Sequence, residues 1–129
     1  MINFKILSVV TAFICFVLCI TLMFYPEIIF LLFDIEQNNS AFFICRRSAI
    51  LFLGVSVYTW SGRSAAHSQS RQAICIGLAV SMFALALLGM AEYNRGYVSS
   101  GIMLAVITES VLAFFYFKIW LSCREKQAF

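Results

Sequence analysis

Charged residues are scarce in this sequence, and their scarcity excludes an ordinary soluble domain. Only 12% of the 129 residues are charged and 63% are hydrophobic, against roughly 25% and 45–50% in soluble globular domains. The nine Lys and Arg residues exceed the six Asp and Glu residues by only three charges. Because these charges are scattered rather than clustered, they indicate no nucleic-acid partner. With a mean hydropathy of +0.95, the chain is expected to have the lipid bilayer as its surroundings.

The motifs of common membrane enzymes are also missing. The sequence has one histidine, His67. A bis-histidine haem, a two-histidine iron site and a zinc-hydrolase motif each need more than one. None of the five cysteines forms a Cys-x-x-Cys pair, which disfavours a thiol oxidoreductase, although Cys19 and Cys45 are expected at similar depth. The sequence has no P-loop and no Gly-x-Ser-x-Gly elbow. We therefore expect no enzymatic activity, no cofactor and no metal site.

Four long apolar runs predict an all-α fold, a four-transmembrane-helix antiparallel bundle. A helix needs about 20 apolar residues to cross roughly 30 Å of hydrocarbon, and the chain has four such segments, at about residues 6–25, 41–60, 72–91 and 98–121. The first run is too long for a signal peptide. Pro26 cannot continue its hydrogen bonding, so residues 26–33 are expected to form a short interfacial helix. Residues 1–129 are thus predicted to be one integral membrane domain.

The basic residues are divided unequally between the two predicted sides. The termini and the middle loop share one side, which has Lys5, Arg63, Arg71, Lys118, Arg124 and Lys126. The other side has Arg95, together with Arg46 and Arg47 inside the second span. Because cytoplasmic segments carry the excess of Lys and Arg, both termini are predicted to be cytoplasmic.

Small and polar residues at helical spacing predict which helix faces pack together. The predicted faces are Ser8, Thr11, Cys15 and Cys19 in the first span, Arg47, Gly54 and Tyr58 in the second, Ala73, Gly77, Ser81 and Gly89 in the third, and Gly101, Ala105, Glu109 and Ala113 in the fourth. The aromatic residues late in the fourth span are expected at the membrane interface: Phe114, Phe115, Tyr116, Phe117 and Trp120.

Three ionisable residues inside the spans form the candidate polar site. Counted from the outer ends of the predicted spans, Glu109 lies roughly 16 Å deep and Arg47 roughly 10 Å deep. A lone charge at such depth costs at least about 2.5–3.5 kcal/mol, so Glu109 is predicted to pair with Arg47 or Arg46. Such a pair is either a structural device or a binding site. Glu92 and Arg95 in the outer loop are candidate contacts above it.

The order of these features resembles a family of small bacterial four-helix membrane proteins, known only as a domain of unknown function. The matching residues are Pro26, Arg46 and Arg47 followed by Leu53-Gly54, Arg63 and Arg71, Arg95-Gly96, and Glu109. The resemblance implies a four-helix fold and a bacterial inner-membrane location. It implies no particular activity, because the family has no established one.

The combined features favour a small inner-membrane binding or accessory protein. Its expected partners are the lipid bilayer, another membrane protein or a second copy, and a small or lipid-like ligand. One alternative is a small transporter or permease component that uses the Glu109 and Arg47 site. Another is a bacteriocin-type immunity protein that blocks a toxin.

Overall fold

The computed structural model describes residues 3–127, with side chains as far as residue 125. The side chain of Lys126, which was counted in the predicted topology, therefore lies outside the described part. Residues 3–127 form five α-helices and no strand: α1 Phe4–Phe24, α2 Pro26–Phe33, α3 Asn39–Gly62, α4 Gln69–Asn94 and α5 Ile102–Gln127. The helices α1, α3, α4 and α5 are long and apolar enough to cross a membrane. The all-helical, four-span prediction is confirmed, and the short helix predicted after Pro26 is present as α2.

Polar caps extend three of the long helices beyond their predicted starts. The side chains of Asn3, Asn38 and Ser68 each accept a hydrogen bond from a backbone N–H in the first turn of α1, α3 and α4. These contacts satisfy donors that a helix N-terminus leaves without a partner. The start of α5 was predicted wrongly. It begins at Ile102 rather than near Val98, because Gly96 has a φ of 75° and the following residues form turns.

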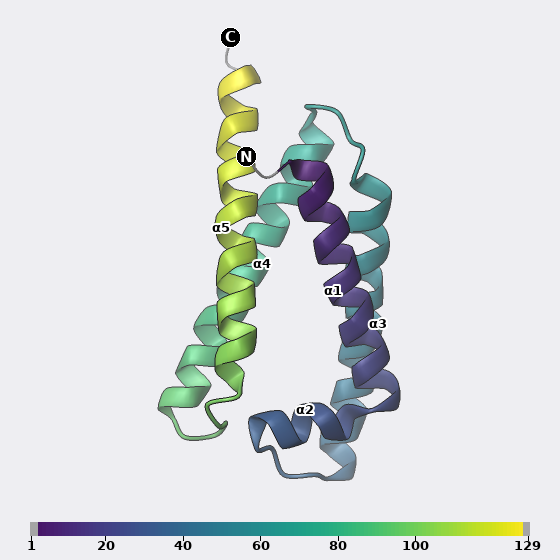
Figure 1. Ribbon diagram of the computed structural model, residues 1–129, viewed down its shortest axis with the longest axis vertical. Coiled ribbons are helices and arrows are strands. Elements are labelled where there is room, and N and C mark those ends of the chain that lie inside the picture. The colour runs from purple at the N-terminus through teal and green to yellow at the C-terminus, as the bar shows by residue number, and fades with distance from the viewer. Residues whose placement is uncertain (1–2, 128–129) are drawn as a thin grey trace.

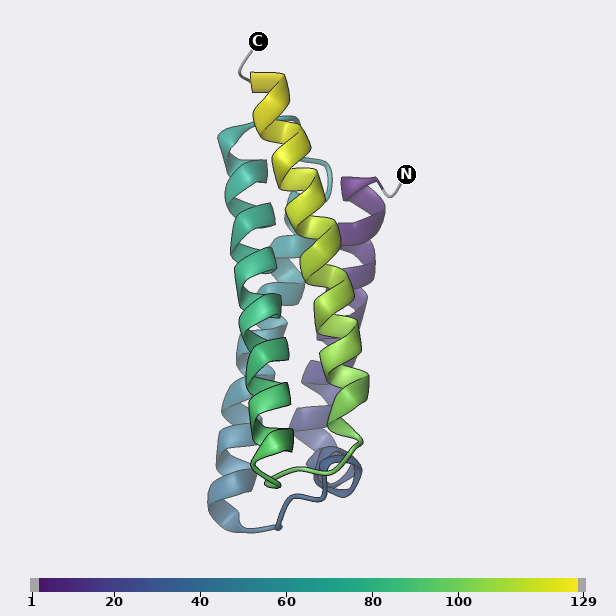
Figure 2. The ribbon, with the colours of Figure 1, turned by 90° about the vertical axis from the view of Figure 1, so that its left-hand side faces the viewer.

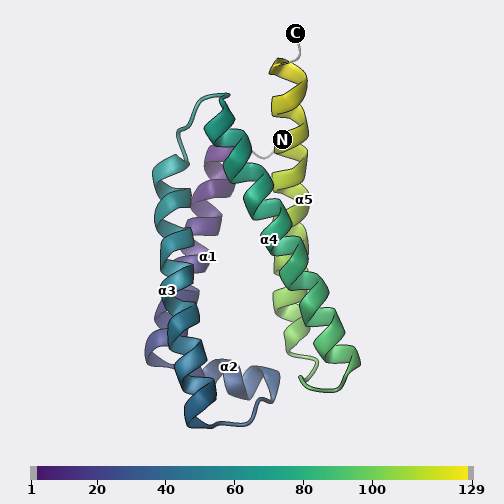
Figure 3. The same ribbon diagram turned by 180° about the vertical axis from the view of Figure 1, so that it is seen from behind.

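The long helices are arranged as two packed pairs, α1 with α3 and α4 with α5. We call these the first pair and the second pair. Figure 1 shows that the pairs approach each other at the end that holds both chain termini and separate toward α2. The same divergence is seen from behind in Figure 3. In the side view of Figure 2 the four long helices run along the same general direction. An antiparallel four-helix arrangement results, with both ends of the chain on one side.

The α2 helix lies across the open end of the molecule and is joined there to the segment before α5 (Figure 1). The backbone N–H of Ser99 donates to the carbonyl of Phe33 at 2.9 Å. The Ser99 hydroxyl donates to the carbonyl of Leu32, also at 2.9 Å. These bonds satisfy two of the last carbonyls of α2 and link the first pair to the second pair.

The core lies where the two pairs meet. Its buried residues come from α1, α4 and α5: Phe4, Leu7, Cys75, Leu78, Ala79, Met82, Leu112, Ala113 and Tyr116. Tyr116 is fully buried, so the expectation that it belongs to an aromatic belt at the membrane interface is wrong. Its ring instead fills the space between the two pairs, where a large side chain gains most from packing.

Of the four predicted packing faces, that of α3 is wrong and that of α4 is wrong except at one residue. In α4 the residues Ala73, Gly77 and Ser81 are exposed and Gly89 is buried, and the packed face also carries Cys75, Leu78, Met82 and Ala86. In α3 the residues Arg47, Gly54 and Tyr58 are exposed, and Ala49, Ser56 and Thr59 are buried. Close approach at a small residue is therefore found at Gly89, where an added Cβ would lie 2.7 Å from a side-chain carbon of Val106, but not along the rest of these two predicted faces. The predicted face of α1 is confirmed, because its four residues are all buried.

Candidate functional site

The predicted ion pair between Glu109 and an arginine of α3 is not formed in the structure. Within residues 3–125 the one side-chain ion pair joins Arg95 to Glu92. The reason is the pairing of helices, because α3 packs against α1 while α5 packs against α4. Arg47 also points away from the packed face, with its guanidinium carbon 5.7 Å from the centre of the Phe43 ring. The prediction assumed that both residues faced a common interior.

Glu109 lies on the inner face of α5, as its predicted stripe required. It follows the buried Val106 by three residues and precedes the buried Ala113 by four, so the three side chains share one side of the helix. Because α5 begins at Ile102, Glu109 is roughly 10 Å from the helix start rather than 16 Å. Its side chain is half-buried, and it has no hydrogen-bond or ion-pair partner among residues 3–125. The carboxyl group therefore has no polar partner within the described part of an apolar helix that is long enough to cross a membrane.

Arg46 and Arg47 are exposed on the outer side of α3. They lie seven and eight residues after Asn39, hence roughly 10–12 Å from the start of the helix. Long arginine side chains at this depth can extend their charged ends toward the headgroups. Neither forms an ion pair with Asp34 or Glu36, since the described residues hold one such pair elsewhere.

The two predicted outer-loop residues contact each other rather than the intramembrane site. A guanidinium nitrogen of Arg95 lies 3.2 Å from a carboxylate oxygen of Glu92, three residues earlier. The Arg95 side chain is 64% exposed, and pairs of this kind contribute about 1 kcal/mol or less. The loop turns at Gly96. Glu92 and Arg95 therefore form a local contact at the C-terminal end of α4.

A buried chain of hydroxyl groups joins the two helix pairs. The Tyr116 hydroxyl donates to Thr11 Oγ1 at 2.9 Å, and Thr11 Oγ1 donates to the carbonyl of Leu7 at 2.9 Å. Ser8 lies one turn from Thr11, and its buried Oγ forms no hydrogen bond within the described residues. The sequence placed Ser8 and Thr11 on a packed face. It did not indicate Tyr116 as their neighbour, because contact across 105 residues depends on how the pairs dock.

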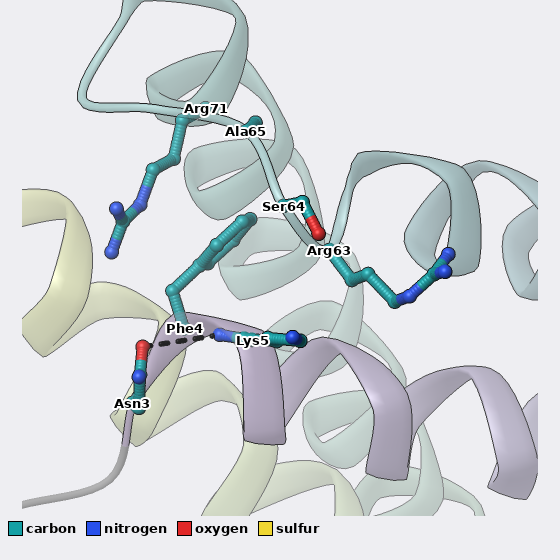
Figure 4. Close-up of a pocket in the computed structure, with 7 residues that line it drawn as sticks. All are labelled: Asn3, Phe4, Lys5, Arg63, Ser64, Ala65 and Arg71. Atoms are coloured by element: carbon teal, nitrogen blue, oxygen red, sulfur yellow. Dashed lines mark hydrogen bonds between the residues drawn. The ribbon is translucent and has the colours of Figure 1, made fainter.

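A basic pocket of about 300 Å³ lies at the end of the molecule that holds the termini. Its lining comes from the start of α1, the loop after α3 and the first turn of α4: Asn3, Phe4, Lys5, Arg63, Ser64, Ala65 and Arg71. In Figure 4 the side chains of Lys5 and Arg63 extend to the same side, and Arg71 lies on the other side of the Phe4 ring. No acidic residue lines this pocket.

Aromatic rings hold both arginines of the basic pocket. The guanidinium carbon of Arg71 lies 4.3 Å from the centre of the Phe4 ring, and that of Arg63 lies 4.2 Å from the Trp60 ring. Arg63 also donates to the carbonyl of Trp60 at 2.6 Å. The sequence had assigned Lys5, Arg63 and Arg71 to one side of the membrane. It did not indicate a pocket, because only the fold brings the N-terminus against the middle loop.

A separate apolar groove of about 480 Å³ runs between α1 and α3. It is lined by Val9, Val10, Ala12, Phe13, Phe16, Ser56 and Trp60. Trp60 therefore lines the groove and also supports Arg63 of the basic pocket.

The side chains that commonly bind metal ions do not form a cluster in the described part of the chain. Within the described residues, no group of three or more His, Cys, Asp or Glu side chains is placed to hold a metal ion. The five cysteines are free, although Cys19 and Cys45 belong to one apolar cluster. Cys123 Sγ lies 3.4 Å from Nδ1 of His67, which ties the loop after α3 to α5.

No protein-family model, no curated protein and no solved structure matches this chain.

Proposed function

We propose that this chain is a multi-pass protein of a bacterial inner membrane, with both termini in the cytoplasm, that acts as a binding or accessory protein. The observation that carries the proposal is the isolated carboxyl group of Glu109 on the inner face of α5. An ionisable side chain at hydrocarbon depth is costly and commonly marks a functional site. The partner of Glu109 would then be a group outside the chain, namely a cation or hydrogen-bond donor on another membrane-embedded molecule.

The arrangement of the helix pairs supports access to this carboxyl group. Tyr116 joins α5 to α1 through Thr11, and Glu109 lies seven residues, roughly 10 Å, nearer to the end where the pairs separate (Figure 1). Because the Glu109 side chain is half-buried rather than enclosed, a partner helix or a lipid-like ligand could reach it from within the bilayer. The same partial exposure also favours the small-transporter alternative, in which Glu109 takes up and releases a proton or a substrate.

A deletion strain with a measurable phenotype tests the proposal. The variant Glu109→Gln keeps the shape of the side chain but removes its charge, so it should reach the membrane in normal amount and fail to restore the phenotype. Glu92→Gln is the matched control, because it removes a carboxylate that contacts only the loop arginine Arg95, and it should restore the phenotype. Full restoration by Glu109→Gln would refute the role of the carboxyl group.

Cross-linking distinguishes an accessory protein from a transporter. A photoreactive residue at position 105, one helical turn from Glu109, should give a discrete cross-linked species that Glu109→Gln abolishes. A transporter would instead show substrate-dependent proton uptake by reconstituted vesicles, with no stable cross-linked partner.

A further inference from the structure

We propose that the basic pocket and the apolar groove together form a binding site for one anionic phospholipid. The pocket would take the phosphate of the headgroup, and the groove would take an acyl chain. This site is distinct from Glu109 and does not depend on the function proposed above.

The charge of the pocket is suited to a phosphate group. Lys5, Arg63 and Arg71 line it, and none of them is ion-paired within residues 3–125. The Nε of Arg71 is buried and has no hydrogen-bond partner. Arginine and lysine donors are the usual ligands of phosphate oxygens, and arginines held against aromatic rings lose less freedom on binding. Because acidic side chains are absent from the lining, a headgroup with an added cation, such as choline, is disfavoured.

The apolar groove lies along the same side of α1 as Lys5 of the basic pocket. Lys5 is followed at helical spacing by Val9, Phe13 and Phe16, which places the four side chains on one face. Lys5 and Phe16 are eleven residues apart, roughly 16 Å along the helix. This length corresponds to about half of a 30 Å hydrocarbon layer. Trp60 joins the two parts, since it lines the groove and stacks on Arg63.

The occupant inferred from this alignment of the pocket and the groove is a lipid rather than free phosphate. A phosphate ion would use the basic pocket alone and leave the adjoining groove unexplained. A glycerophospholipid places its charge at the membrane surface and its chain directly below, as the pocket and the groove are placed. Basic residues near a membrane surface attract anionic lipid by about 1 kcal/mol each, or roughly five-fold in affinity.

Fluorescence quenching of Trp60 measures occupancy of the groove. The chain has two tryptophans, so Trp120→Phe leaves Trp60 as the single reporter. The full-length protein is reconstituted into phosphatidylcholine vesicles that contain either phosphatidylglycerol or phosphatidylcholine with brominated acyl chains. Brominated phosphatidylglycerol should quench Trp60 with an apparent affinity roughly five- to thirty-fold higher than brominated phosphatidylcholine. Equal quenching by the two lipids would overturn the proposal.

Charge-removing variants test whether the preference for phosphatidylglycerol comes from the basic pocket. Lys5→Gln with Arg71→Gln should reduce the preference for brominated phosphatidylglycerol several-fold, because Arg63 is then the one basic residue left in the lining. Lys118→Gln with Arg124→Gln removes the same charge from the same end of the molecule but outside the pocket, and it should leave the preference unchanged. If the pocket double variant does not fold, the single variant Lys5→Gln tests the proposal instead. Lys5 is exposed, so this variant should fold, and its preference for phosphatidylglycerol should fall several-fold. An equal loss in the Lys118 and Arg124 variant would show a diffuse surface charge effect and refute the site.

Inorganic phosphate at constant ionic strength distinguishes the two sources of the phosphate group. It should displace brominated phosphatidylglycerol no better than chloride does. Displacement by phosphate alone would assign the pocket to a free anion and overturn the lipid assignment.

Discussion

At the scale of single residues, the hydroxyl groups of Thr11 and Tyr116 form a polar link between the two helix pairs. Both side chains are fully buried. Tyr116 donates to Thr11, which in turn donates to the backbone of its own helix. Inside a bilayer no water replaces a lost partner, so each such bond helps to fix how helices dock. Glu109 differs because nothing within the described residues accepts or donates to it, which is why it is the residue proposed to contact a partner.

Removal of one hydroxyl group tests this link. Tyr116→Phe should lower the free energy of unfolding by about 1 kcal/mol, since interhelical hydrogen bonds in membranes contribute about 0.6–1.7 kcal/mol. Denaturant unfolding in mixed micelles measures the change. Tyr97→Phe is the control, because Tyr97 is 68% exposed and should change stability little. A loss in the control as large as in Tyr116→Phe would contradict the role of the buried bond.

At the scale of helices, the end of α2 is closely packed against the segment that precedes α5. A Cβ atom built on Gly101 would overlap the carbonyl oxygen of Leu32, so only glycine fits there. Ser99 bonds to the same carbonyl. The α2 helix is thus held by the second pair as well as by its own connections to α1 and α3.

Substitution of Gly101 should therefore loosen the contact between α2 and the second pair. Gly101→Ala should destabilise the protein by about 1–3 kcal/mol, the usual cost of forcing an extra group into a packed site. Gly77→Ala is the matched control. Nothing lies within 4 Å of its added Cβ, so it should be neutral or stabilising because alanine favours helix. Thermal unfolding in detergent compares them, and equal stability of the two variants would contradict the close packing.

At the scale of the whole molecule, the chain forms two helix pairs that meet at one end and are joined by α2 at the other (Figure 3). The basic pocket lies at the end with the termini, and Glu109 lies toward the other end. The two candidate sites are therefore well separated, and each can be tested without the other.

The proposed topology has a direct test. Reporter fusions after Gln72 and after Phe129 should both report a cytoplasmic location, because Lys and Arg accumulate on that predicted side. The loop that contains Arg95 should report the opposite side. A periplasmic signal from either of the first two fusions would overturn the proposed topology. Periplasmic signals from both would reverse the orientation and place the basic pocket at the outer leaflet.

The sequence by itself determined the number and kind of helices. Long apolar runs and the single proline act locally, so the bounds of α1, α2, α3 and α4 were predictable to within a few residues. The caps Asn38 and Ser68 also act locally and start α3 and α4 a few residues before the apolar runs. The later start of α5 was not, because the turns before it are held partly by the bond from Ser99 to Phe33, a contact between distant segments.

Only the tertiary structure decided which faces of α3 and α4 pack and which polar groups meet. In lipid, apolar residues surround each helix, so polarity does not distinguish an inner face from an outer one as it does in water. Small residues did not reliably indicate the inner faces either, since Gly54 and Gly77 are exposed while Tyr116 is buried. The pairing of α1 with α3 and of α4 with α5 separated Glu109 from Arg46 and Arg47. The same docking brought Lys5, Arg63 and Arg71 around one pocket, because side chains distant in the sequence meet only when whole helices pack together.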